Sequence, residues 1–218
     1  MSPATKKRTV PKLDLRRQYK DLYLPSAKEP AIVEVPELLF IALDGQIEAG
    51  VGPSESVAFT TAIGAMYGVA YGLKFMSKLR ENDPIDFTVM ALEGLWGSGD
   101  GDFEFGSQEP WRFTLLMMQP DHITADMFDQ VVAETNSKRP NPDLARVELL
   151  RWEEGLAVQM MHVGPYAEEP RTMERLVALT EETGHRPVGR HHEIYIGDPR
   201  RAKPENLKTV LRHPIAPL

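Results

Sequence analysis

The sequence predicts an α+β fold of two βαββ units related by pseudo-twofold symmetry, with antiparallel sheets, helices on one side and a central ligand cleft. The order strand, helix, strand, strand occurs at residues 35–120 and again at 156–214. In each copy the second strand ends in a glycine turn, and the third ends in apolar residues followed by proline. We therefore expect one domain over 31–218, preceded by a basic N-terminal arm over 1–30.

The first copy opens with the apolar run "VPELLFIALDGQ" (35–46), which predicts a strand that ends at an Asp-Gly turn. Apolar residues at helical spacing predict a long helix over 52–80, with Ser54 as its N-cap. Three glycines recur four residues apart on another stripe of this helix: Gly64, Gly68 and Gly72. Glycine lowers helix propensity, so we expect another element to approach that stripe closely.

The runs 85–97 and 109–120 complete the first copy as two strands, joined by the turn-rich segment "SGDGDFEFGSQ". A helix capped by Thr124 should follow and end near Pro140. This helix and the strand after it are expected as extra elements between the copies.

The extra strand is expected at "ARVELLRW" (145–152), and the tight link "EEG" joins it to the second copy. That copy contains a strand at "GLAVQMMHVGPY" (155–166), a helix over 168–184 and strands at 189–199 and 205–215. Gly184 is expected to cap the C-terminal end of the helix.

Composition excludes several classes of protein. With 42% hydrophobic and 26% charged residues, the chain is typical of globular proteins. It has no apolar run long enough for a membrane span and no signal-peptide core, so we expect a cytoplasmic location. The absence of cysteine excludes disulfides, thiolate metal sites and thiol nucleophiles. Neither a phosphate-binding glycine loop nor a GxSxG nucleophile elbow is present.

Charge is distributed unevenly. Residues 1–20 carry seven basic side chains and one acidic side chain, on a chain of net charge −7. The arm could bind nucleic acid, but an arm lying on its own acidic body is the favoured interpretation. No aromatic-rich basic groove supports specific nucleic-acid binding.

Three segments together, "FTVMALEGLW", "HVGPYAEEPRTMERL" and "HHEIYIGDPRRAKPENLKTVLR", resemble the GyrI-like small-molecule-binding family over roughly residues 30–215. The resemblance implies the duplicated βαββ fold of multidrug-regulator effector domains and SOUL-type proteins. It also implies a cleft that binds bulky aromatic, often cationic, molecules beside one buried glutamate. Some stand-alone members resemble hydrolases that open the cyclopropane ring of DNA-alkylating compounds. The chain before the first strand is too short for a helix-turn-helix domain, which departs from the regulators.

Glu193 is the candidate catalytic residue. Strand alternation places it on one face with His191 and Tyr195, whereas His192, Ile194 and Ile196 share the other face, which we expect to pack against the helices. Glu193 also matches the buried glutamate that the resemblance implies. A partly desolvated carboxylate in a cleft can bind a cation, accept a proton from water or donate one. The alternative is a solvent-exposed strand glutamate.

The paired histidines do not predict a metal site. They point to opposite faces, and no HExxH or HxxxH spacing occurs, so His191 and Glu193 supply at most two ligands where a catalytic zinc usually has three. We expect no metal and no cofactor, haem included.

Further candidates for the ligand-binding residues are aromatic or soft. Tyr67 and Tyr71 share a stripe of the long helix and could form one wall of the cleft, or an amphipathic flank. Trp96, in the "GLW" segment, resembles a pocket residue of the family, and Trp111 is a weaker candidate. Met90 aligns with Glu193 when "MALEG" is matched to "EIYIG", and would place a soft apolar surface opposite the acid.

Tyr195 could stack on a guest or serve as a cross-strand packing residue. Tyr166 could reach the cleft, but a turn-stabilising role is the favoured interpretation. Together these features favour a protein that binds a hydrophobic aromatic small molecule and possesses one activating carboxylate, Glu193, for hydrolysis of a strained ring. The alternatives are a non-catalytic drug-sequestering or sensing module, and a protein-interaction role such as topoisomerase inhibition by an acidic surface.

Overall fold

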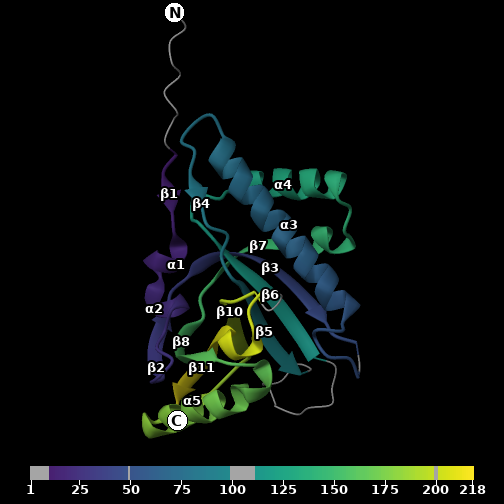
Figure 1. The fold of residues 1–218 in the computed structure, drawn as a ribbon. Helices are drawn as coiled ribbons and strands as arrows, with labels where there is room; N and C mark the ends of the chain where they lie inside the picture. The colour runs from purple at the N-terminus through teal and green to yellow at the C-terminus, as the bar shows by residue number, and fades with distance from the viewer. Residues whose placement is uncertain (1–9, 49, 99–110, 199–200) are drawn as a thin grey trace, which may run out of the picture.

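Two βαββ units lie side by side in one sheet (Figure 1). The structure is a computed structural model that describes residues 10–48, 50–98, 111–198 and 201–218. The first unit consists of β3 (Leu38–Gln46), α3 (Val57–Leu79), β5 (Leu92–Ser98) and β6 (Trp111–Gln119). The second consists of β8 (Gly155–Val163), α5 (Glu169–Glu182), β10 (His191–Tyr195) and β11 (Lys208–Pro217). The predicted α+β class and the duplication are confirmed.

The two units meet at the centre of the sheet, where β5 and β10 pair antiparallel and Gly94 faces Glu193 in register. The strand order is β2-β8-β11-β10-β5-β6-β3-β7, so the order within one unit mirrors that within the other. The pseudo-twofold axis therefore passes between β5 and β10, and the central strands bring residues from both copies together.

The edge strands are exchanged between the units. β2 (Ala31–Val35) precedes the first unit but pairs with β8 of the second, and β7 (Glu148–Trp152) precedes the second unit but pairs with β3 of the first. β7, which was predicted as an extra strand between the copies, is thus the counterpart of β2. Each unit is therefore preceded by one further strand. β7 was predicted, whereas β2 was not, because the predicted first strand began only at residue 35, and Pro36 separates β2 from β3.

The smaller elements lie around this sheet. They are β1 (Lys12–Leu13), α1 (Leu15–Gln18), α2 (Lys20–Tyr23), β4 (Asp86–Phe87), α4 (Ala125–Lys138), β9 (His185–Pro187) and short 3-10 turns at 142–146, 166–168 and 204–206. β1 pairs in parallel with β4, and β9 pairs with the end of β11. Among the described residues, no helix combines the length and apolar character that crossing a membrane requires.

The sheet has two differently covered faces. On the first, here called the helix face, α3 packs over β3 and β6, and α5 packs over β8 and β11. On the second, the arm face, Leu15, Leu22 and Tyr23 of the N-terminal segment are buried against strand residues that include Phe40 and Ile194. The prediction that Ile194 packs against the helices of the two units is therefore wrong. Ile194 lies on the opposite face, where the N-terminal segment forms a second apolar layer.

The glycine stripe of α3 faces α4, as close packing predicts. A Cβ atom built on Gly72 would lie 2.4 Å from Val131 Cγ1, and one on Gly68 would lie 3.1 Å from Thr135 Cγ2. The long helix begins later than expected, because Ser56 rather than Ser54 accepts a hydrogen bond from Phe59 N and caps it. The Thr124 cap of α4 is confirmed.

Two sequence expectations concern the strands that lead to the site. The predicted strand 85–97 is interrupted: β4 ends at Phe87 and β5 begins only at Leu92, so Met90 lies in the connection. The turn-rich connection between β5 and β6 falls mainly on residues 99–110, outside the described residues.

Candidate functional site

A polar and aromatic cluster lies on the helix face where the two units meet. Strand alternation brings Trp96 from β5 and His191, Glu193 and Tyr195 from β10 onto this face. The first turn of α5 and the turn before it add further members, Glu169 and Tyr166. We call these six residues the helix-face cluster.

A hydrogen-bonded chain fixes the orientation of the carboxylate. The indole Nε1 of Trp96 donates to the Tyr195 hydroxyl oxygen at 3.0 Å, and the Tyr195 hydroxyl donates to Glu193 Oε2 at 2.7 Å. An indole nitrogen only donates, so the phenolic proton is directed at the carboxylate. Burial, together with the nearby charge of Glu193, raises the pKa of Tyr195 well above its usual value. Tyr195 therefore remains a donor across the physiological range.

Gly94 leaves room for this chain. A Cβ atom at this position would lie 2.9 Å from Trp96 Nε1 and 3.2 Å from the Tyr195 hydroxyl. Because Gly94 is the register partner of Glu193, the absence of a side chain there also leaves the carboxylate uncovered by its cross-strand neighbour.

The second oxygen of Glu193 faces a histidine. His191 Nε2 lies 3.4 Å from Glu193 Oε1, and the buried His191 ring stacks on His213 at a centroid distance of 6.0 Å. The Glu193 side chain retains 15% of its accessible surface, whereas the imidazole beside it has none. The carboxylate is thus the part of this pair that solvent or a guest reaches.

Tyr166 and Glu169 border the carboxylate from the helix side. The Tyr166 ring meets the Tyr195 ring edge-on at 6.3 Å and remains 41% exposed. Burial and the charges of Glu169 and Glu193 raise the pKa of Tyr166 to about 12. Tyr166 was favoured as a turn residue over a cleft residue, and Glu169 was not among the predicted site residues. The strand pattern carried no signal for either, since both belong to the segment that leads into α5.

The remaining predicted ligand-binding residues are divided between two places. Trp96 is buried, and its ring packs against Trp111 at 5.8 Å, so Trp111 supports the cluster from behind. Tyr67 packs against the core below α3 and stacks on Tyr71 at 6.3 Å. Tyr71 is 47% exposed and stacks on Phe75. Both tyrosines line a groove of about 1080 Å³ between α3 and α4.

Met90 does not occupy the position predicted for it. It is buried on the arm face, beside Ala91 and Leu95, and therefore lies on the opposite side of the sheet from Glu193. The prediction assumed an uninterrupted strand up to the glycine turn, whereas β5 begins two residues after Met90 and pairs Gly94 with Glu193.

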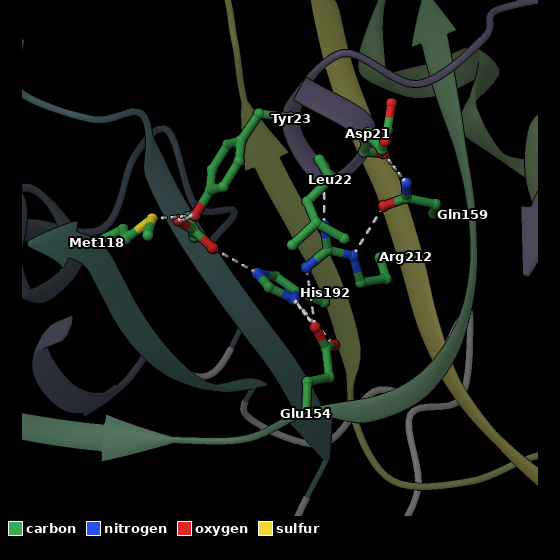
Figure 2. Close-up of polar contacts among 9 residues, drawn as sticks. Asp21, Leu22, Tyr23, Met118, Glu154, Gln159, His192 and Arg212 are labelled. Carbon is green, nitrogen blue, oxygen red and sulfur yellow. Dashed lines mark hydrogen bonds and ion pairs between the residues drawn. The ribbon is translucent and has the colours of Figure 1, made fainter. Parts of the chain in front are cut away.

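A second polar cluster, the arm-face network, lies on the other side of the same two strands (Figure 2). His192 Nε2 is 3.1 Å from Glu93 Oε2, and its Nδ1 is 3.0 Å from Glu154 Oε1. Arg212 donates to Glu154 at 2.9 Å and to the Leu22 carbonyl at 2.8 Å. The side chains of these four charged residues are almost completely buried.

The electrostatics of the arm-face network follow from its pairing. Burial alone would lower the pKa of His192, but the charge of Glu154 and hydrogen bonds to both glutamates raise it. Both ring nitrogens face carboxylates, which is the arrangement of an imidazolium that donates twice. Burial would likewise raise the pKa of Glu154, yet His192 and Arg212 lower it to about 2. Two anions and two cations thus compensate each other.

This network attaches the N-terminal segment to the sheet. The Tyr23 hydroxyl donates to Glu93 Oε1 at 2.7 Å, and Gln159 Nε2 donates to the Asp21 carbonyl at 2.6 Å (Figure 2). Every carboxylate oxygen of Glu93 and Glu154 has a partner, so the network is a structural feature with no group available to a guest. Within the part of the chain that the structure describes, no group of three or more acidic or histidine side chains could hold a metal ion.

Comparisons with known proteins agree with this architecture. The family model of the GyrI-like small molecule binding domain matches residues 113–216. An uncharacterized conserved protein from Listeria innocua is 35% identical, with a TM-score of 0.83, and the match covers 94% of this chain and 100% of that one. A hydrolase from the same organism is 34% identical, with a TM-score of 0.80 and the same coverage. Comparison with curated proteins gave no significant match.

A more distant likeness concerns the fold alone. The C-terminal domain of EcmrR is 13% identical with a TM-score of 0.51, and the match covers 87% of this chain and 98% of that domain. The fold and the comparisons together define a small-molecule-binding protein built from a βαββ duplication. The chain belongs to the GyrI-like family.

Proposed function

We propose that this protein binds a bulky aromatic small molecule against the helix-face cluster and hydrolyses a strained ring in it, with Glu193 as the general base. The observation that carries the proposal is a partly exposed carboxylate whose Oε2 accepts the Tyr195 hydroxyl. A similar protein from Listeria innocua is described as a hydrolase, which supports the hydrolytic part.

The chemistry follows from the two oxygens of Glu193. Oε2 is engaged by Tyr195, which holds the carboxylate in one orientation, and Oε1 retains lone pairs that can accept a proton from an attacking water molecule. A carboxylate held in this way needs no reorientation when the water reacts. His191, at 3.4 Å from Oε1, borders the position that this water would take.

The aromatic surroundings favour a flat guest. Tyr166 offers an exposed ring at the edge of the cluster, and Tyr195 offers the ring beneath it. Trp96 is buried and acts through Tyr195, so it is a positioning residue in this proposal. An aromatic guest would gain both apolar burial and ring contacts here.

The test uses an aromatic compound that carries a spirocyclopropane ring, with ring opening followed by mass spectrometry. The wild-type chain is expected to add one water molecule per turnover. Glu193→Gln should reduce the rate at least about 100-fold, as loss of a general base does. The exposed Glu205→Gln serves as the control and should retain the wild-type rate.

Undiminished turnover in Glu193→Gln would contradict the role of this carboxylate. Saturable binding that returns the intact compound on denaturation would instead support the alternative, a sequestering module without chemistry. The residues of the helix-face cluster would then be binding residues only.

A further inference from the structure

Glu169 is a second carboxyl group on the helix face, and the proposed function leaves it unused. It occupies the first position of α5 and is only 6% exposed, although glutamates at helix starts are usually solvated. One carboxyl oxygen is hydrogen-bonded to Thr209. The other, Oε1, is buried and has no hydrogen-bond partner within the described part of the chain.

The sheet register places this carboxyl group beside Glu193. Thr209 of β11 pairs with Tyr195, and Leu211 pairs with Glu193. Thr209 is therefore the diagonal neighbour of Glu193 on the same face, a separation of roughly 7–8 Å in antiparallel sheets. Both Tyr166 and Tyr195 experience the charges of both glutamates, so the two carboxyl groups border the same small region.

The two glutamates differ in their surroundings. Glu193 accepts a hydrogen bond from Tyr195, whereas Glu169 is more deeply buried and has one oxygen without a partner. Burial and then the charge of Glu193 raise the pKa of Glu169 to about 9, although the N-terminus of α5 favours an anion. At neutral pH, Glu169 therefore carries a proton that it can donate.

A purely structural role does not account for the unpaired oxygen. The buried glutamates of the arm-face network, Glu93 and Glu154, have partners for both of their oxygens. An unsatisfied buried carboxyl oxygen costs stability and is uncommon unless a ligand or a functional role explains it. Glu169 thus has the features of a group that meets a guest.

We propose that Glu169 is a second catalytic residue, the general acid that protonates a conjugated carbonyl oxygen of the strained-ring substrate while Glu193 accepts the proton of the attacking water. This inference rests on the proposed function and assigns a role to a buried carboxyl group that the proposed function leaves unused.

The step is balanced in atoms and electrons. The water oxygen forms a bond to a ring carbon, and the C–C bond of the ring breaks. Its electron pair moves through the conjugated system to the carbonyl oxygen, which takes the Glu169 proton and becomes a hydroxyl. Glu193 takes the proton lost by water, and exchange with solvent returns both carboxyl groups to their starting states. The net reaction adds one water molecule and requires no oxidant, reductant or cofactor.

The experiment compares Glu169→Gln with wild type, Glu193→Gln and the control Glu168→Gln, an exposed neighbour. Glutamine matches the shape of the protonated carboxyl group, so Glu169→Gln should keep the fold and the affinity for the unreacted compound. Turnover should fall about 100-fold or more. A second compound, whose ring-opened oxyanion is stabilised by electron-withdrawing substituents, should recover much of the rate in Glu169→Gln but not in Glu193→Gln.

The pH profile of turnover supplies an independent readout. Wild-type turnover should decline on the alkaline side near pH 9, where the acid loses its proton, and this limb should be absent in Glu169→Gln. A normal rate in Glu169→Gln, or a wild-type profile without the limb, overturns the acid role while the Glu193 result still stands. Absence of turnover in wild type overturns the proposed function and this inference together.

Discussion

Replacing Glu154 by Gln tests whether the arm-face network determines the stability of the fold. The change removes the anion that lies 2.9 Å from Arg212 and 3.0 Å from His192, while the size of the side chain is nearly preserved. Two buried cations then share the single remaining carboxylate, Glu93. Breaking a buried ion pair in this way leaves uncompensated charge in the interior.

The magnitude follows from the pKa of Glu154. Its interactions lower the pKa from 4.5 to about 2, and each unit corresponds to about 1.4 kcal/mol, so they contribute about 3 kcal/mol at neutral pH. Removing one partner of a buried pair typically costs roughly 3–5 kcal/mol, which is the same range. We therefore expect the free energy of unfolding of Glu154→Gln at pH 6 to be lower than that of wild type by about 3 kcal/mol.

The assay is urea unfolding at a series of pH values, with the exposed neighbour Glu153→Gln as control. The stability that Glu154 contributes is present above about pH 4.5 and is lost as the pH falls towards 2. The difference in free energy of unfolding between wild type and Glu154→Gln should therefore become smaller over that range. His192 has a raised pKa, so its contribution is full below about pH 6.5 and is lost as pH rises through its folded pKa. A loss of less than about 1 kcal/mol at pH 6, or an equal loss in Glu153→Gln, would show that the Glu154 ion pairs do not determine stability.

Two further predictions concern packing and the arm. Gly72→Ala should lower the melting temperature, because its Cβ would meet Val131 Cγ1 at 2.4 Å. Gly64→Ala should raise the melting temperature, because alanine stabilises a helix by about 0.5–1 kcal/mol relative to glycine and its Cβ has room there. Equal shifts in the two variants would contradict the α3–α4 packing. Tyr23→Phe removes the hydroxyl that donates to Glu93 at 2.7 Å. It should lower the free energy of unfolding by about 1.5–3 kcal/mol and speed proteolysis near the N-terminal segment. Unchanged stability and proteolysis would show that apolar contacts alone hold this segment.

Local sequence patterns were sufficient for most of the elements. The helical spacing from Phe59 to Leu73, the Thr124 cap and the alternation in "HHEIY" each depend on neighbouring residues, and all three are found in the structure. The glycine stripe of α3 also predicted a close neighbour, because only packing offsets the low helix propensity of glycine.

The features that were missed depend on distant residues. Tyr23 and Glu93 are 70 positions apart, and His192 and Glu93 are 99 apart, so no spacing in the chain indicates that they meet. Met90 was misplaced because one break between β4 and β5 shifts the alignment of the copies. Glu169 resembled an ordinary helix-start acid, and only the register of β10 with β11 places it beside Glu193.

A crystal structure of a complex would show whether an aromatic guest lies against Glu193. Glu193→Gln, soaked with the spirocyclopropane compound, should hold the intact guest. We expect the strained ring to face residue 193, with the rings of Tyr166 and Tyr195 in contact with the guest. A guest seated instead in the groove between α3 and α4, against Tyr71 and Phe75, would contradict it.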